Sequence, residues 1–125
     1  MLTGRDILIV SRPKFGALRH VGVLLPNGYV AHCAPGRGEH VSTVEEFASG
    51  HDMTIDRAVP HMEHTGTLQR IAEAMRSPKP YNVTKNNCEM FANRVTTGKA
   101  ESPQLQGTIV LLGLAMFMGW AAAKK

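Results

Sequence analysis

Apolar and polar residues alternate with a period of two in several short stretches of the chain, a pattern typical of β-strands. Two of these stretches flank Asn27-Gly28, a pair that readily adopts the positive φ angles of a tight hairpin turn. The sequence therefore predicts an antiparallel hairpin among its strands. The predicted strands are residues 6–11, 19–25, 29–34 and 53–59.

Capping residues and helical spacing predict three helices between these strands and the C-terminal region. Ser42 and Glu45 have the spacing of a capping box, which predicts a short helix ending near residue 49. Apolar residues share one face of residues 68–76, for which Thr65 or Thr67 is the expected cap. The third helix is predicted to start at Asn86-Asn87 and to end at Gly98.

The C-terminal region differs from the rest because residues 105–123 carry no charge. As a helix this stretch is about 28 Å long, close to the hydrocarbon thickness of a bilayer. Trp120 and the closing lysine pair stand where interface anchors belong. We therefore expect residues 1–101 to form one domain and residues 102–125 to form a hydrophobic membrane-anchor helix. A buried core helix and an oligomer contact are the alternatives.

Length, charge and cysteine content narrow the class of protein. A chain of 125 residues with a net charge of +4 is an ordinary small globular domain, and its scattered Lys and Arg residues argue against nucleic-acid binding. Two cysteines do not make a disulfide framework. We therefore expect a reducing compartment, with the domain on the cytoplasmic side of a membrane, and we evaluate both cysteines as thiols.

Cys88 stands at the predicted start of the third helix. Unpaired N–H groups and the helix dipole favour an anion at this position, and the thiolate is the nucleophilic form of cysteine. The sequence therefore predicts a reactive Cys88. A small buried cysteine on an amphipathic helix remains the alternative.

Two histidines lie on the strands of the predicted hairpin. His20 and His32 can point to one side of the paired strands, and a base beside a thiol is the minimum for nucleophilic catalysis. The remaining histidines are expected in loops or on the surface. A metal site is an alternative use of His32 and Cys88, together with Cys33 and His40, although their spacing fits no known zinc pattern.

Three segments resemble the lecithin:retinol acyltransferase-like family, which includes small phospholipase A and acyltransferase enzymes. Residues 18–23 and 27–35 are similar to the first half of that family, with a histidine in each segment. Residues 86–93 resemble its Asn-Cys-Glu-His-Phe signature, with Met90 in place of the signature histidine. Residues 97–104 and the apolar tail also match the way in which family members end.

The resemblance implies an α+β fold of the permuted papain-like (NlpC) type, with a small antiparallel sheet packed on helices. It implies that Cys88 is the nucleophile, that His20 is the general base and that His32 orients His20. The implied reaction is cysteine-dependent phospholipase A or acyltransferase chemistry through an acyl-thioester, with a phospholipid substrate and no cofactor or metal. The rate would then follow a histidine ionisation near neutral pH.

The sequence is also compatible with two other functions. A papain-like cysteine peptidase or amidase would use the same three residues. A non-catalytic membrane-anchored binding protein would need none of them and could use the glycine-rich tail to oligomerise. The sequence does not specify the lipid headgroup, the acyl acceptor or the oligomeric state.

Overall fold

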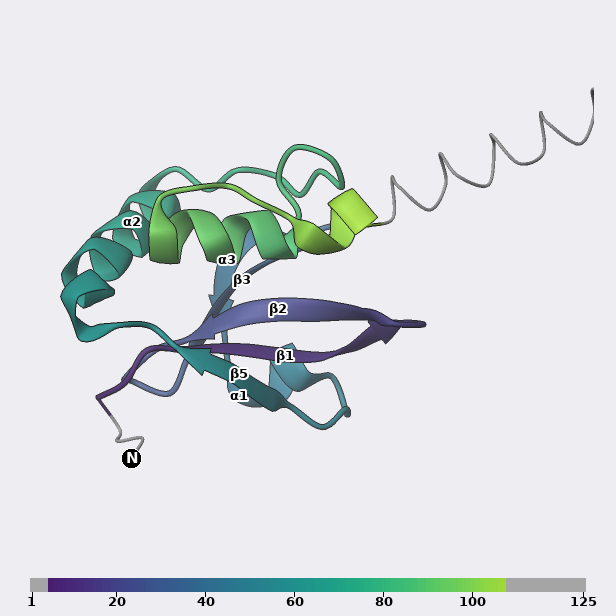
Figure 1. Ribbon diagram of the computed structural model, residues 1–125, viewed down its shortest axis with the longest axis horizontal. Helices are drawn as coiled ribbons and strands as arrows, with labels where there is room; N and C mark the ends of the chain where they lie inside the picture. The colour runs from purple at the N-terminus through teal and green to yellow at the C-terminus, as the bar shows by residue number, and fades with distance from the viewer. Residues whose placement is uncertain (1–4, 108–125) are drawn as a thin grey trace, which may run out of the picture.

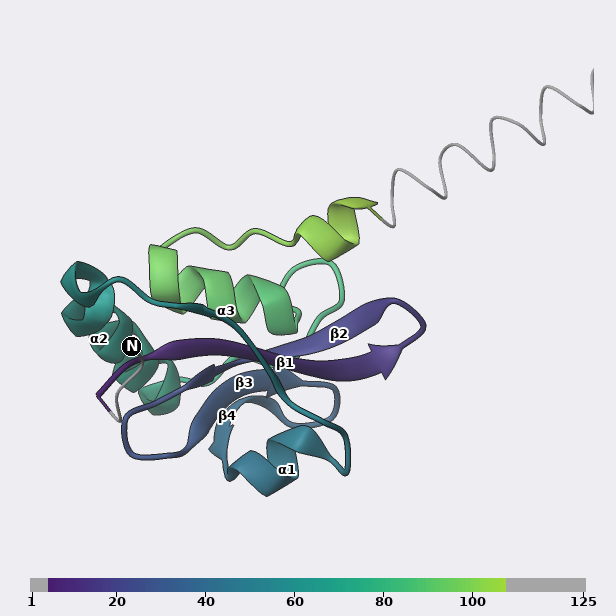
Figure 2. The same ribbon diagram turned by 60° about the horizontal axis from the view of Figure 1, so that its bottom comes forward.

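In the computed structural model, which describes residues 5–107, a five-stranded antiparallel sheet separates two groups of helices (Figure 1). The strand order is β4-β3-β2-β1-β5, and the fold class is α+β. Helices α2 and α3 cover one face of the sheet and α1 covers the other (Figure 2). The elements are β1 (Leu8–Phe15), β2 (Leu18–Leu24), β3 (Val30–Ala34), β4 (Gly38–Ser42), α1 (Val44–Ala48), β5 (Thr54–Ala58), the 3-10 helix η1 (His61–Glu63), α2 (His64–Arg76) and α3 (Cys88–Thr97).

The sheet has an apolar cluster on each face, because successive residues of a strand point to opposite sides. The larger cluster lies under α2 and α3 and includes Val21, Val23 and Phe91. The smaller cluster surrounds Phe47 of α1, whose side chain is fully buried. Alternate residues of β2 therefore serve two different faces, and this arrangement decides how the candidate site is assembled.

Strands β2 and β3 separate soon after the hairpin turn. Within residues 5–107, their ladder contains only the pairs Val23–Ala31 and Leu24–Val30. Beyond that point β2 remains paired with β1 as far as Leu18. The edge of β2 that faces β3 is therefore open to other partners near Arg19.

The predicted hairpin is confirmed, and Gly28 adopts a φ angle of +86° in its turn. The first strand extends beyond its predicted end at Ser11, through Pro13. Arg19, the partner of Pro13 in β2, directs its N–H and C=O away from β1 toward the side chain of Gln104. The Pro13–Arg19 pair therefore needs no N–H from the proline, and the strand continues.

Strand β4 was not predicted, and two helix starts differ from their predicted positions. The side chain of Thr43, and not that of Ser42, caps α1 by accepting a hydrogen bond from the Glu46 N–H at 3.1 Å. Helix α2 starts at His64, so Thr67 is a buried residue inside the helix and not its cap. A capping-box pattern offers two neighbouring hydroxyls here, and only the backbone decides which one is used.

Helix α3 is as predicted. The Asn87 side chain accepts a hydrogen bond from the Met90 N–H at 2.8 Å, and Gly98 ends the helix with a φ angle of +83°. The next segment, residues 103–107, is helical, and the Ser102 hydroxyl caps it by accepting from the Leu105 N–H at 3.2 Å.

Most of the predicted membrane-anchor helix (residues 102–125) lies outside the described residues, which end at residue 107. Within residues 5–107, no helix combines the length and the apolar character that crossing a membrane requires. The anchor therefore remains a prediction from the sequence.

Candidate active site

Cys88 is the first residue of α3 and its side chain is buried, with 3% of the residue exposed. The sulfur lies at the open edge of β2, where it is 3.9 Å from the carbonyl oxygen of Arg19. Asn87 fixes this end of the helix, because its amide also donates to the Val83 carbonyl (3.0 Å) and the Ser102 hydroxyl (3.2 Å). The predicted position of the cysteine at a helix start is therefore correct.

The helix start was also expected to make the Cys88 thiol more acidic, and this expectation is wrong. Burial raises the pKa of the Cys88 thiol, and the negative charge of Glu89 adds to the rise. The backbone N–H groups of Val21 and Glu89 and the ammonium group of Lys14 act in the opposite direction, but they do not outweigh burial. At neutral pH this thiol is therefore protonated, and it needs a base.

His20 and His32 face the other side of the sheet, where they form a hydrogen-bonded pair. Nε2 of His20 lies 2.9 Å from Nδ1 of His32, and Nε2 of His32 lies 2.8 Å from the hydroxyl of Ser42. The Ser42 hydroxyl donates its hydrogen to the carbonyl oxygen of Thr43 at 3.1 Å. We refer to this sequence of hydrogen bonds as the histidine relay.

The histidine relay fixes the tautomer of both rings. Because Ser42 gives its only hydrogen to Thr43, it accepts the hydrogen bond from Nε2–H of His32. Nδ1 of His32 is then the acceptor for Nε2–H of His20. In the neutral ring the remaining nitrogen of His20, Nδ1, carries a lone pair and can accept a proton.

Both rings are held in their neutral form. Burial, followed by the charges of Arg12 and Lys14, lowers the pKa of His20 to about 4. Burial and the neighbouring His40 lower the pKa of His32 to about 3. The expected histidine ionisation near neutral pH is therefore wrong, because His20 already has its lone pair at pH 6 and above.

Aromatic packing holds the relay in place. The ring of Phe47 stacks on His20 with centroids 5.2 Å apart, and it meets His32 edge-on at 5.1 Å. His40 of β4 packs against His32 at 4.1 Å. Sequence reasoning missed Ser42, Phe47 and His40, because their roles depend on β4 and on α1 crossing the far face of the sheet.

The sulfur and the relay approach β2 from opposite sides. Cys88 belongs to the cluster that contains Val21, whereas His20 packs on Phe47 in the other cluster. Within residues 5–107, no hydrogen bond joins the sulfur to either imidazole. The sulfur instead contacts the carbonyl of Arg19, one peptide from the base. Nδ1 is bonded to the ring carbon nearest the backbone, so it is the nitrogen of His20 closest to this peptide.

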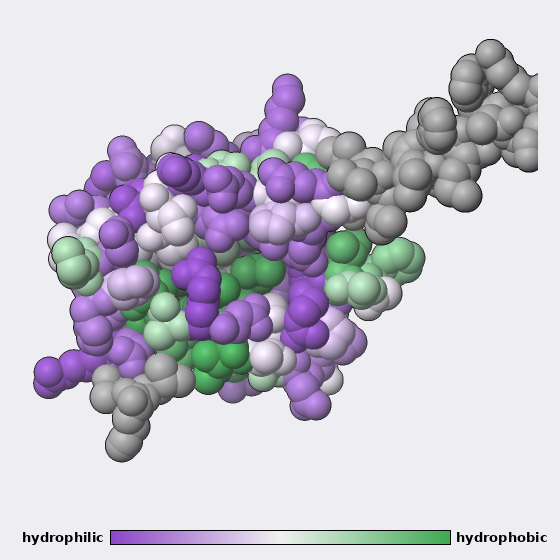
Figure 3. Space-filling model, viewed as in Figure 1, coloured by the Kyte–Doolittle hydropathy of each residue, from purple (hydrophilic) through white to green (hydrophobic). Residues whose placement is uncertain are grey.

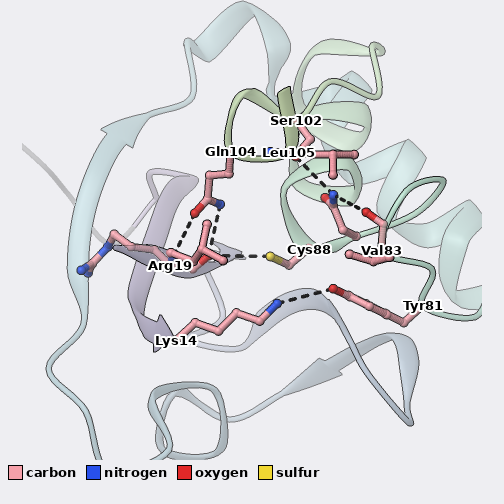
Figure 4. A pocket seen from close by; sticks show the side chains of 10 residues that line it. Lys14, Arg19, Tyr81, Val83, Cys88, Ser102, Gln104 and Leu105 are labelled. Atoms are coloured by element: carbon pink, nitrogen blue, oxygen red, sulfur yellow. Dashed lines mark hydrogen bonds between the residues drawn. The ribbon is translucent and has the colours of Figure 1, made fainter. Parts of the chain in front are cut away.

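A cavity of about 120 Å³ opens above Cys88 (Figure 4). Lys14 and Tyr81 lie on one side of it and Gln104 on the other, and the Lys14 ammonium donates to the Tyr81 hydroxyl at 3.4 Å. Its apolar lining consists of Leu18, Val83 and Leu105. The thiol is thus at the base of a pocket whose lining combines apolar side chains with the cationic residues Lys14 and Arg19.

Comparison with known proteins places the chain in a family. Residues 2–101 match the profile of the family described as lecithin retinol acyltransferase. The chain belongs to this family. It is also similar to the human protein "Phospholipase A and acyltransferase 2", with 26% identity over an alignment that covers 88% of this chain and 80% of the relative. The family resemblance predicted from the sequence is confirmed.

Gln104, a residue that the sequence did not single out, fills the open edge of β2 in this LRAT-family chain. Its side-chain oxygen accepts from the Arg19 N–H at 2.8 Å, and its side-chain nitrogen donates to the Arg19 carbonyl at 3.2 Å. The Glu89 carboxylate holds the segment by accepting from the Gln104 N–H (2.9 Å) and the Ser102 hydroxyl (2.7 Å). The side chain of Gln104 therefore takes the place of a neighbouring strand.

The second cysteine lies away from the pocket. Cys33 is fully buried in the core under α3, and its sulfur lies 3.5 Å from the Asn86 carbonyl. Burial, followed by the charge of Glu39, raises its pKa to about 12. Its neighbour His32 faces the opposite side of β3. In the described part of the chain, no group of three or more His, Cys, Asp and Glu residues is arranged to hold a metal ion.

Proposed function

We propose that the protein is a cysteine-dependent phospholipase A or acyltransferase in which an acyl group passes through a thioester on Cys88. The family and the human relative support acyl transfer or phospholipid hydrolysis in general. The observation that carries the cysteine mechanism is the histidine relay, which leaves a proton-accepting nitrogen on His20, next to the peptide that the Cys88 sulfur contacts.

In the first half-reaction, Nδ1 of His20 takes the thiol proton as the Cys88 sulfur attacks the carbonyl carbon of a lipid ester. The ester C–O bond then breaks, the leaving alcohol takes the proton from Nδ1, and the acyl group remains on sulfur. Because burial keeps the thiol protonated, proton removal and attack must be coupled. The proposed mechanism therefore requires that the Cys88 sulfur and Nδ1 of His20 come within hydrogen-bond distance when the lipid ester is bound.

In the second half-reaction, His20 removes a proton from water, an alcohol or an amine, which attacks the thioester carbonyl. The C–S bond breaks and the proton returns to sulfur. His32 supports both steps by accepting Nε2–H of His20, which fixes the reactive tautomer and stabilises the imidazolium that forms. His32 is thus a positioning residue in this proposal.

The remaining parts of the proposal concern the fold type and the membrane. The order of two histidine strands before a cysteine helix supports a permuted papain-like (NlpC-type) relationship. The uncharged residues 105–123 support a C-terminal membrane anchor, and the two unpaired cysteines support a cytoplasmic location of the domain. An anchored enzyme would keep its active site beside a substrate that stays in the bilayer.

The test is to trap the thioester. The full-length protein is incubated with phospholipid in mixed micelles and quenched in acid, and its intact mass is measured. We expect a fatty-acyl mass on the wild type and on Cys33→Ala, and no adduct on Cys88→Ala. A folded protein that forms no adduct and releases no fatty acid would contradict the proposal. Alkylation by iodoacetamide would then separate a peptidase or amidase with a reactive Cys88 from a non-catalytic protein.

A further inference from the structure

The end of the β1–β2 hairpin exposes apolar side chains to solvent. Phe15 is 78% exposed and Leu18 is 36% exposed, and the intervening Gly16 and Ala17 are exposed as well. Figure 3 shows a hydrophobic patch at the right-hand edge of the molecule, where the β1–β2 hairpin of Figure 1 ends. An exposed aromatic ring at the end of a hairpin contributes nothing to the core, so its position calls for another explanation.

The apolar surface continues into the Cys88 pocket. Leu18 lines the pocket as well as the hairpin tip, and Val83, which is 58% exposed, lines it from the loop before α3. We refer to Phe15, Leu18 and Val83 as the hairpin rim. An apolar group that contacts the hairpin rim therefore has a continuous apolar path to the thiol.

The size of the pocket requires that most of a fatty-acyl chain stay outside it. The cavity above Cys88 measures about 120 Å³, whereas pockets that enclose a drug-sized ligand measure roughly 300–1,000 Å³. The pocket can accommodate the ester and the first carbons of the chain. The rest of the chain must remain in an apolar phase at the hairpin rim.

The positive charge of the domain and the position of its C-terminal segment both indicate that this apolar phase is a lipid bilayer. Lys14 is exposed beside Phe15 and also lines the pocket, and the chain has a net charge of +4. Both features favour an anionic lipid surface. The helical segment 103–107 lies next to the pocket through Leu105, and the uncharged sequence continues from there to residue 123. The hairpin rim and the predicted anchor thus start from one end of the domain (Figure 1).

We propose that the hairpin rim inserts into the surface of a lipid bilayer, with Phe15 in the acyl region and Lys14 at the phosphate groups, so that an acyl chain reaches Cys88 without leaving the lipid. The role given to insertion, which is to deliver an acyl chain to Cys88, rests on the proposed function. Insertion itself does not depend on catalysis and can be measured separately.

The binding experiment uses the full-length chain with a single reporter indole. Phe15→Trp is made in a Trp120→Phe background, and emission is recorded with vesicles of phosphatidylcholine and phosphatidylserine that carry brominated acyl chains. We expect a blue shift and quenching of at least about half of the emission. The matched control is Met62→Trp in the same background. Met62 is 95% exposed on η1, which contacts α2. Helix α2 lies at the opposite end of the domain from the tip of the β1–β2 hairpin (Figure 1), so the indole of the control should stay unquenched.

Two results of this experiment would overturn the proposal. One is an indole at position 15 whose emission does not change with vesicles, or changes no more than that of the control. The other is a blue shift without lipid that grows with protein concentration, which would indicate that a second copy of the chain covers the hairpin rim.

A kinetic experiment tests the purpose of insertion. Phe15→Ser should reduce turnover of phospholipid in vesicles about tenfold and leave turnover of a short-chain phospholipid below its micellar concentration within twofold of wild type. Met62→Ser should change neither rate. Equal losses on both substrates, or no loss on either, would overturn the proposal. A wild-type protein that cleaves neither substrate would refute the proposed function, and the quenching experiment would still decide insertion.

Discussion

Cys33 and Cys88 are both free and both buried, yet they have very different surroundings. Cys33 is enclosed by the core, and burial together with the Glu39 carboxylate raises its pKa to about 12. Cys88 lies at the base of a pocket, where Lys14 and the N–H group of Val21 partly offset the effect of burial. A positive charge acts on both thiols, Arg94 on Cys33 and Lys14 on Cys88. The comparison teaches that access from a pocket, and not charge alone, separates a candidate nucleophile from a core residue.

The same comparison limits what a helix start can do. The N-terminus of α3 is the position where a thiolate is favoured, but burial still raises the pKa of Cys88 above its ordinary value. Reactivity must therefore come from a partner that removes the proton during the reaction. His20 is the proposed partner, and only Cys88 lies beside its peptide.

Replacement of the two cysteines by alanine should give the largest difference in rate between two variants. Cys88→Ala should reduce acyl transfer by about a thousandfold or more, because the variant lacks the sulfur that carries the acyl group in the proposed mechanism. Cys33→Ala should leave the rate within about threefold and lower the free energy of unfolding by about 1–2 kcal/mol, the cost of a small core cavity. Steady-state rates and urea unfolding measure both effects. Comparable rate losses for the two variants would remove the distinction between the cysteines.

Replacement of the base should have the next largest effect. His20→Gln keeps a hydrogen-bond donor but cannot take a proton, so the rate should fall by about 10²–10⁴. His40→Gln is the matched control, because His40 packs on His32 but forms no hydrogen bond within the relay. Its rate should remain within about threefold of wild type. The same loss for both variants would indicate that packing, and not proton transfer, is being measured.

The parts of the fold that could be predicted from the sequence depend on local signals. Asn27-Gly28 specifies the hairpin turn, and Asn87 and Gly98 specify the two ends of α3. These residues act on their own backbone, so their effect does not depend on the rest of the chain. The same locality explains why Cys88 could be placed at a helix start.

The parts that could not be predicted depend on contacts between distant segments. Ser42 completes the histidine relay only because β4 pairs with β3 and sets His40 opposite His32. Gln104 reaches Arg19 across 85 residues of sequence, at an edge that is open only because β2 and β3 diverge. The pKa shifts of the histidines and cysteines could not be predicted either, because they are caused mainly by burial. Burial is a property of the packed domain, and no motif encodes it.

Acidification should destabilise the fold through the histidine side of the sheet. Both histidines are neutral in the folded chain, with pKa values of about 4 for His20 and about 3 for His32, whereas in the unfolded chain they titrate near 6.5. Between pH 6.5 and 4 the unfolded state therefore binds more protons, so stability is full above pH 6.5 and falls as the pH drops. The slope should approach about 1.4 kcal/mol per pH unit for each histidine. In His20→Gln the slope measured by urea unfolding should be smaller, and an unchanged slope would contradict the assignment.

The edge of β2 beside Cys88 should show a smaller, local effect. Gln104→Leu keeps the size of the side chain but removes both hydrogen bonds to Arg19. The Arg19–His20 peptide, which lies between the thiol and the base, is then no longer held in position. We expect a roughly fivefold to tenfold loss in kcat with little change in KM, because the pocket keeps its volume. Gln106→Leu, the same change at an exposed position two residues further along the chain, is the control. A change confined to KM would mean that Gln104 contacts substrate and does not position the peptide.

The rate near neutral pH should change least of all. If the resting site holds a protonated thiol and a neutral imidazole, as the raised pKa of Cys88 and the lowered pKa of His20 imply, neither group titrates between pH 6 and 8. The rate of acyl transfer should then vary less than about twofold over that range and should fall only on approaching pH 4. A thiolate–imidazolium pair would instead lose activity through a group with a midpoint near neutrality. A midpoint near 6.5 in kcat/KM, present in wild type and absent in His20→Gln, would therefore show that the relay opens to solvent before substrate binds.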